Sequence, residues 1–205
     1  MDTSSKKEKE KIMVQQNIYN KNKILRHIVL ASFLSYMPVA LSYLIKEIGV
    51  PGFLIPYFRY FIFFPLIVMS FYVPKMMAFV GGFLSEMFIF YLKTKRTHYN
   101  PLESLFCALC FVLIPSLFLK KKDNFCKFYF VILLASSLFQ IVSWYNILKY
   151  RYKLDLLDIQ KFDQIIHILK IDLGIRLIVI VPIISLILAL ILKKLLPRLE
   201  FFDNI

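Results

Sequence analysis

The sequence predicts an all-α, polytopic membrane protein in which six transmembrane helices form a compact bundle. Hydrophobic residues make up 59% of the 205 residues and aromatic residues 17%, so too little polar surface is left to cover a water-soluble globule. The 26 Lys and Arg residues gather between the apolar segments, as topology signals of membrane proteins do. The formal net charge of +13 is therefore assigned to membrane topology, and nucleic-acid binding is rejected.

Residues 1–23 are polar and lysine-rich. Neither the apolar segment of a signal peptide nor a small-residue cleavage site is visible, so we interpret these residues as a cytoplasmic basic tail. The first span is expected at residues 24–45, which are long enough to cross a hydrocarbon core about 30 Å thick at about 1.5 Å per residue. Pro38 is expected to bend this span.

The remaining spans follow from apolar runs that are separated by basic or proline-containing connections. Residues 46–56 contain two glycines and two prolines and predict an irregular loop. Pro74 fits the first turn of a helix, where its missing N–H costs nothing. Spans two to six are expected at residues 57–73, 74–92, 101–119, 125–148 and 175–195. Residues 24–196 thus form the transmembrane domain, and residues 197–205 form a cytoplasmic C-terminal tail.

The even number of spans places both termini on the same side of the membrane. More Lys and Arg residues lie on that side than on the other, so both termini are expected in the cytoplasm. The sequence therefore predicts a multi-pass protein of the cell membrane.

Polar side chains of five spans are expected in one outer layer of the bundle. Arg59 begins span two, Glu86 lies in the outer half of span three, and Arg176 begins span six. Charges at such positions cost several kcal/mol in hydrocarbon and are functional candidates by default. The layer predicts a ligand pocket open to the exterior, to which spans four and five add Tyr99, Asn100, Trp144, Tyr145 and Asn146.

Each member of this layer also has a structural interpretation. An arginine at a helix end can anchor the helix at the interface, and Trp144 and Tyr145 could belong to the aromatic belt. Glu86 could pair with Arg59, and Glu103 could be only a favourable charge at a helix N-terminus. The prediction of a pocket depends on the convergence of these groups.

Span one carries a strip of small side chains, formed by Ala31, Ser35 and Ser42. The spacings of four and seven residues place them on one helix face. Such strips allow close approach between helices in lipid. The strip could pack inside the bundle, as we also expect of Gly81-Gly82, or it could bind another membrane protein.

The order of these features resembles the substrate-binding S component of an energy-coupling factor (ECF) transporter, most of all the folate-type members. The resemblance covers all six spans. It rests on Ala31-x-x-x-Ser35, Arg59 followed by Phe64-Pro65-Leu66, Gly81-Gly82 with Glu86, Tyr99-Asn100-Pro101, and Arg176 to Pro182-Ile183.

The resemblance implies a subunit that binds a vitamin near the outer face with high affinity. It also implies that uptake requires a separate transmembrane T component, which meets the small-residue face of span one, and two ATPases. The chain has no Walker A glycine loop, and we expect neither enzymatic activity nor a cofactor. A membrane enzyme would need clustered His, Asp or Glu, whereas His27, His98 and His167 are scattered.

Folate chemistry fits the predicted layer. Arg59 and Arg176 could bind the two carboxylates of the glutamate tail, and Glu86 could accept hydrogen bonds from the pterin amino group and ring N–H. The pteridine ring could be held by Trp144, Tyr145, Asn146 and Asn100. Riboflavin or thiamine would satisfy the aromatic part as well, and a scaffold subunit without a ligand is a further alternative.

Overall fold

The computed structural model describes residues 3–51, 55–93, 101–154 and 171–199, and all regular structure in these ranges is helical. The α-helices are α1 (Thr3–Glu47), α2 (Ile55–Ile62), α3 (Phe64–Tyr72), α4 (Lys75–Lys93), α5 (Pro101–Ala108), α6 (Ile114–Phe118), α7 (Phe125–Leu154) and α9 (Val181–Arg198). Two π-helical segments, η1 (Leu109–Leu113) and η2 (Arg176–Ile180), complete the order. The all-α prediction is confirmed for these residues.

Each predicted span contains helical residues, but the helices differ in length and apolarity. Within the described parts of the chain, four helical segments are long and apolar enough to cross a membrane: Tyr19–Glu47, Pro101–Phe118, Phe125–Ser143 and Ile171–Arg198. The apolar helical stretch Phe58–Tyr72 is shorter. These apolar helices indicate a membrane protein, whereas the count of six spans and the side on which the termini lie stay predictions.

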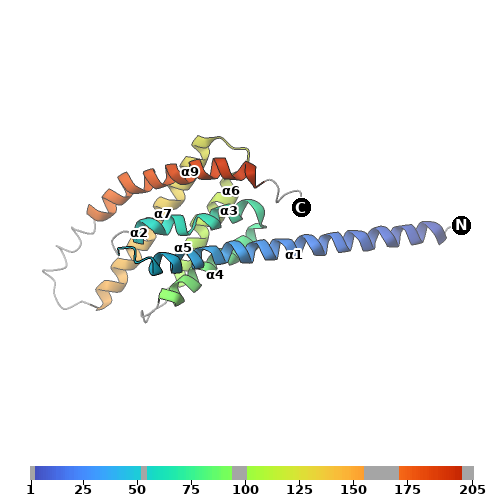
Figure 1. The fold of residues 1–205 in the computed structure, drawn as a ribbon, viewed down its shortest axis with the longest axis horizontal. Coiled ribbons are helices and arrows are strands. Elements are labelled where there is room, and N and C mark those ends of the chain that lie inside the picture. Colours follow the sequence, from blue (N-terminus) through green and yellow to red (C-terminus); the bar gives the residue numbers. More distant parts are fainter. Residues whose placement is uncertain (1–2, 52–54, 94–100, 155–170, 200–205) are drawn as a thin grey trace.

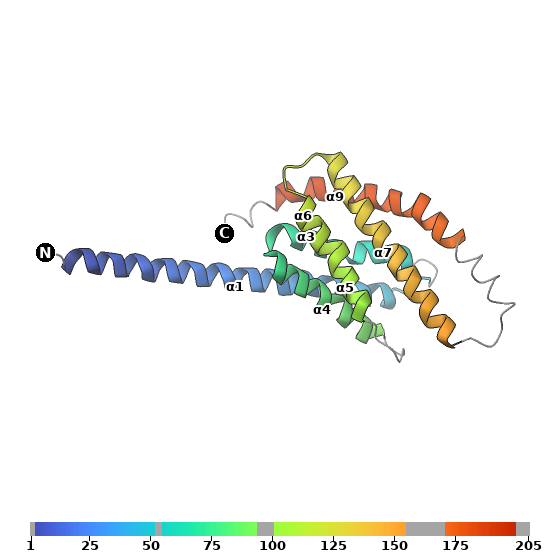
Figure 2. The ribbon, with the colours of Figure 1, turned by 180° about the vertical axis from the view of Figure 1, so that it is seen from behind.

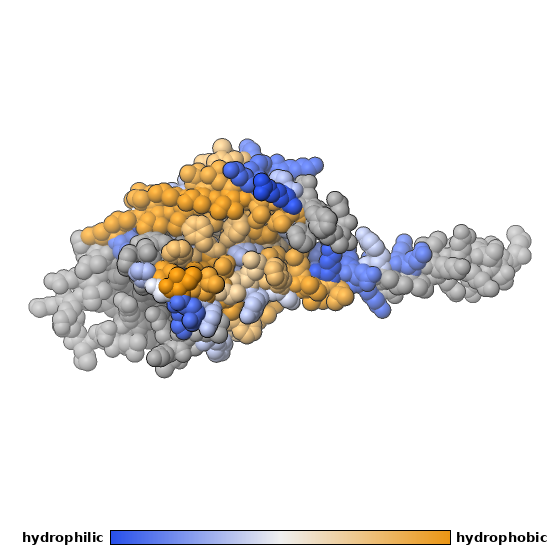
Figure 3. All heavy atoms as spheres, viewed as in Figure 1, coloured by the Kyte–Doolittle hydropathy of each residue, from blue (hydrophilic) through white to orange (hydrophobic). Residues whose placement is uncertain are grey.

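The outer surface of the bundle is apolar. Large hydrophobic side chains are exposed along the long helices; Met76, for example, is 77% exposed and Ile178 is 79% exposed. Figure 3 shows that hydrophobic residues cover much of the visible face, while hydrophilic residues gather at the C-terminal end of α9 and where α1 leaves the bundle. Such a surface is suited to lipid, because water would not solvate so large an apolar area.

Helix α1 extends far beyond the rest of the fold (Figure 1). The residues interpreted as a basic tail are therefore helical from Thr3 onward and continue the same helix that packs against α3 and α4. Pro38 is buried within α1, and the helix continues past it. On the opposite flank, α7 and α9 pack along each other (Figure 2).

Pro65 explains why the second predicted span consists of two short helices. Its ring nitrogen cannot donate to the carbonyl of Phe61, and its ring would clash with that carbonyl in a continuous helix. The chain accordingly leaves regular helix at Phe63, between α2 and α3.

Two further prolines explain the π-helical segments. Pro115 and Pro182 each follow a π segment closely, and the residues four positions before them, Phe111 and Ile178, lie within η1 and η2. A proline removes the hydrogen bond to that carbonyl and its ring presses against it. The wider π turn accommodates the ring without ending the helix.

Three aromatic rings form the core beneath the predicted outer layer. The Phe111 centroid lies 5.1 Å from that of Phe63 and 5.0 Å from that of Phe139, and the Phe63 and Phe139 centroids are 5.6 Å apart. Each ring is at most 2% exposed. This aromatic trio joins α7 and η1 to the break between α2 and α3.

The two adjacent glycines of α4 allow close contacts on two sides, as the sequence predicted. A Cβ atom at Gly81 would lie 2.3 Å from Ser35 Oγ of α1, and one at Gly82 would lie 2.9 Å from Val112 Cγ2 of η1. Because adjacent helical residues point in different directions, Gly81 sets the approach of α1 while Gly82 sets that of η1.

The contact between Gly81 and Ser35 predicts a rescue experiment. Gly81→Ala should lower the thermal unfolding temperature in detergent, because the added methyl overpacks the contact at a cost of about 1–3 kcal/mol. Adding Ser35→Ala should recover part of the loss, since it removes the conflicting oxygen. Gly174→Ala is the control because no atom lies within 4 Å of its added Cβ. An unchanged unfolding temperature for Gly81→Ala would contradict the close approach.

Candidate ligand-binding site

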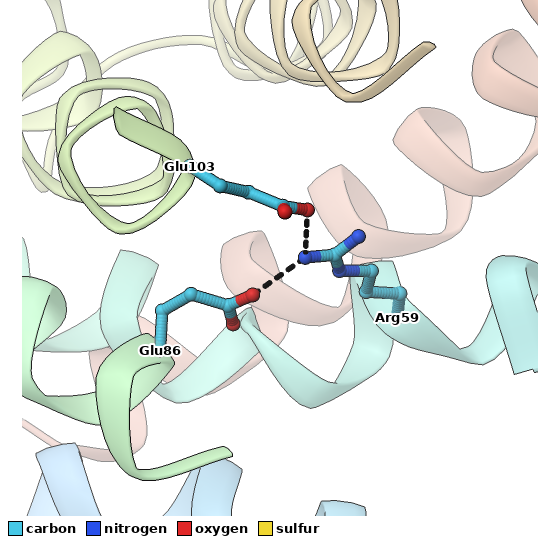
Figure 4. A network of polar contacts seen from close by, with 3 residues as sticks. All are labelled: Arg59, Glu86 and Glu103. Atoms are coloured by element: carbon cyan, nitrogen blue, oxygen red, sulfur yellow. Dashed lines mark hydrogen bonds and ion pairs between the residues drawn. The ribbon is translucent and has the colours of Figure 1, made fainter. Parts of the chain in front are cut away.

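One arginine and two glutamates converge from three helices. Arg59 Nη2 donates to Glu86 Oε1 at 2.5 Å and to Glu103 Oε1 at 2.6 Å. Figure 4 shows the guanidinium between the two carboxylates, with Arg59 on α2, Glu86 on α4 and Glu103 on α5. We call these three residues the Arg59 cluster.

Local sequence explains how two of the partners are positioned. Glu86 follows Gly82 by one helical turn, so the face of α4 that approaches α5 and η1 also presents the carboxylate toward them. Pro101 begins α5, a position at which proline is favoured. Glu103 lies in the first turn of α5, where the helix dipole favours a negative charge.

The aromatic trio supports the guanidinium from below. Arg59 Cζ lies 4.9 Å from the Phe139 ring centroid and 5.7 Å from that of Phe63, distances at which a cation is attracted to an aromatic face. Beside it, the Tyr60 hydroxyl donates to Gln140 Oε1 at 2.6 Å, which links α2 to α7. The cation is thus enclosed by carboxylates and by aromatic rings.

Exposure differs within the cluster. The side chain of Glu86 is 7% exposed, whereas those of Arg59 and Glu103 are 24% and 27% exposed. Arg59 Nε is buried without a hydrogen-bond partner among the described residues. The accessible side of the cluster therefore consists of Glu103 and part of the guanidinium.

The cluster has a net negative charge when both glutamates are ionised. The two oxygens accept from one nitrogen at 2.5 and 2.6 Å, so they lie within about 5 Å of each other and repel by about 3 kcal/mol at an effective dielectric constant of about 20. A cation or an N–H donor at this site would relieve the repulsion.

Among the other predicted ligand residues, Arg176 is the one whose side chain the structure describes. Arg176 lies at the start of η2, where its Nε is 2.8 Å from Asp172 Oδ2. Two predicted residues, Tyr99 and Asn100, lie outside the described residues. Three others belong to α7, but their side chains lie outside the described part: Trp144, Tyr145 and Asn146.

The sequence placed Glu103 in the outer polar layer without a role in ligand binding, and it indicated neither Phe139 nor Gln140. Glu103 was interpreted as a possible helix-terminal charge, and the structure shows that it also pairs with Arg59. Phe139 lies in the apolar part of α7 without a local signal, and Gln140 is an isolated polar residue there.

The small-residue strip lies on the helix that packs against α3 and α4. The distance between Ser35 Oγ and Sδ of Met69 on α3 is 3.6 Å. Ser42 is buried, at 7% exposure. Ala31 and Ser35 also line a groove of about 560 Å³ between α1 and α4. The strip therefore packs partly within the chain, while its role in binding a T component stays a prediction.

Comparisons with protein-family models, curated proteins and solved structures found no match to this chain. The resemblance to S components accordingly rests on the residues themselves.

The Arg59 cluster predicts non-additive effects on stability. Arg59→Met should lower the free energy of unfolding by about 3–5 kcal/mol, because it leaves Glu86 buried without its cation. Adding Glu86→Gln to that variant should recover part of the loss by removing the uncompensated charge. The readout is the unfolding temperature in detergent, with exposed Arg198→Met as the matched control. A coupling below about 0.5 kcal/mol would show that the two side chains act independently.

Proposed function

We propose that this chain is the vitamin-binding S component of an ECF-type importer, with folate as the ligand that the resemblance favours. It binds the vitamin near the outer face, and uptake depends on a separate T component and two ATPases. The observation that carries the proposal is the Arg59 cluster, in which charged side chains from three helices meet at one end of an apolar bundle.

Stability alone is a poor explanation for such a cluster. Replacing a buried ion pair with packed hydrophobic residues is often neutral or stabilising, because desolvation of the charges opposes their attraction. Charged groups within membrane helices mark binding sites and transport pathways far more often than charges in soluble proteins do. The partial exposure of Arg59 and Glu103 leaves the cluster accessible to a ligand.

The contacts of the arginines refine the folate hypothesis. A glutamate-tail carboxylate would have to displace Glu103 or Glu86 from Arg59, and at Arg176 it would meet the ion pair with Asp172. The pterin edge, which carries an amino group and a ring N–H, needs no such displacement. In this proposal the cluster therefore binds the heterocycle and the tail binds elsewhere.

A scaffold subunit without a small-molecule ligand is the second candidate. It is favoured by the same contacts, because both arginines have carboxylate partners within the chain. In that case the Arg59 cluster would only fix α2, α4 and α5 to one another.

Binding of a vitamin to the purified chain separates the two candidates. The unfolding temperature in detergent should rise with one member of a panel of folates, riboflavin, thiamine and biotin. A ligand at one hundred times its dissociation constant stabilises the folded state by about 2.7 kcal/mol. If no vitamin of the panel raises the unfolding temperature of protein that unfolds cooperatively, the scaffold candidate is favoured.

The groove between α1 and α4 supports the second part of the proposal. It is lined by exposed Ser32, Tyr36, Met76 and Val80 as well as by two members of the small-residue strip, Ala31 and Ser35. In lipid, a hollow beside small side chains allows a helix of another subunit to approach closely. We assign this groove, with Ala31 and Ser35, to the T component.

Filling the groove should separate assembly from ligand binding. Ser32→Trp, at an exposed position that lines the groove, should abolish co-purification with co-expressed T component and ATPases while the vitamin response is kept. Phe33→Trp is the matched control, because Phe33 is 61% exposed and does not line the groove. Co-purification of both variants would assign the groove to lipid instead.

A further inference from the structure

We propose that the turn between α6 and α7, together with the last turns of α9, binds the headgroup of an anionic phospholipid. Basic side chains form this surface at one end of the apolar bundle. We call it the lysine patch, and it comprises Lys120, Lys121, Lys122, Lys127, Lys193, Lys194 and Arg198. The inference goes beyond the proposed function, because it depends neither on a vitamin nor on a T component.

Charge is the first argument. Residues 119–127 and 190–199 contain the basic residues of the patch and one acidic residue, Asp123. Asp123 Oδ2 accepts hydrogen bonds from Lys127 Nζ and from the main-chain N–H of Lys120, each at 2.8 Å, so this carboxylate is engaged within its own turn. Clusters of roughly four to eight Lys or Arg residues beside a transmembrane helix are typical of surfaces that bind anionic lipids.

Contacts between distant segments are the second argument. Lys193 Nζ on α9 donates to the main-chain oxygen of Asp123 at 2.6 Å, across 70 positions of the sequence. Lys121 Nζ lies 3.9 Å from the ring centroid of Tyr72, the last residue of α3. The Tyr72 hydroxyl donates in turn to the main-chain oxygen of Leu196 on α9, at 3.1 Å. The fold therefore brings the basic residues of the turn and those of α9 to one place.

Insertion topology alone does not explain this arrangement. The topology rule concerns the number of basic residues near the ends of spans, and it places no requirement on how they are arranged in the folded chain. In this chain Lys121 and Lys193 hold the turn against α3 and α9, which makes them positioning residues. The lysines exposed on the resulting surface, which would meet a phosphate group, are Lys120, Lys122 and Lys194.

The apolar surface beside the patch is the third argument, and it favours a lipid over a soluble anion. Large hydrophobic side chains within three residues of the patch are exposed, among them Leu117, Phe118, Phe130 and Leu190. Figure 3 shows the hydrophilic C-terminal end of α9 next to the hydrophobic face of the bundle. A phospholipid matches both parts, because its phosphate would lie at the lysines while its acyl chains extend along the apolar helices. A soluble anion would use the charged part alone.

Lipids that differ only in the headgroup test the inference on the unmodified chain. Dioctanoyl phosphatidylglycerol and dioctanoyl phosphatidylcholine are titrated into the purified chain in a neutral detergent, and dissociation constants are obtained from the shift in unfolding temperature. We expect phosphatidylglycerol to bind at least about tenfold more tightly, because several basic residues attract its charge. The preference should shrink as the ionic strength rises from about 0.1 to about 1 M, since the Debye length falls from about 10 to about 3 Å.

Matched variants locate the headgroup preference. The combined substitutions Lys120→Gln, Lys122→Gln and Lys194→Gln should reduce the preference to within about threefold. The control combines Lys21→Gln, Lys23→Gln and Lys46→Gln, which change the net charge equally at exposed positions of α1, and it should keep the tenfold preference. The comparison of the two lipids on the unmodified chain stands even if a variant fails to fold.

Glycerol phosphate, which carries the phosphate without acyl chains, separates a lipid site from a site for soluble phosphate. Stabilisation by glycerol phosphate as strong as that by phosphatidylglycerol would overturn the inference. Equal affinity of the unmodified chain for the two lipids would also overturn it, and so would an equal loss of preference in both sets of variants. A headgroup preference that only the variant of the patch loses would support the inference. These readouts involve no vitamin, so their failure leaves the proposed function untouched.

Discussion

Compensation of the Arg59 charge is the constraint on which one end of this bundle depends. A guanidinium in an apolar bundle needs acceptors, and this chain supplies them from α4 and α5, helices that are distant in sequence from α2. The break at Phe63 helps, because it turns that ring toward Phe111 and Phe139 beneath the charge. The two ion pairs of this guanidinium thus hold three helices together and fix the surface that a ligand would meet.

The close packing of α4 makes this contact geometrically possible. Gly82 lets η1 approach α4, and one turn later the same face carries Glu86. Since η1 continues α5, the approach also determines where Glu103 lies. Gly81 has the corresponding role toward α1, and in lipid such small-residue contacts replace the hydrophobic drive that holds soluble helices together. The glycine pair is therefore linked both to helix packing and to the candidate site.

The sequence predicted the helical class and the positions of the helices because apolar length and composition are local properties. It also left open the pairing of Glu86 with Arg59, which the structure shows. It did not predict that Glu103 would complete the cluster or that Phe139 would lie against the guanidinium, because both depend on how helices are placed relative to one another. The break at Phe63 and the π segments could have been expected from Pro65, Pro115 and Pro182.

The pairing of Arg59 changes how its sequence context is interpreted. An arginine at the outer end of a span suggests an anion receptor, but a guanidinium held by two carboxylates no longer presents its charge to an incoming anion. The accessible charge belongs instead to Glu103, which is more exposed than Glu86. A positively charged residue can therefore build a negatively charged site, when its role is to orient the carboxylates around it. For this chain, a ligand at the cluster would meet the charges of all three side chains and not that of Arg59 alone.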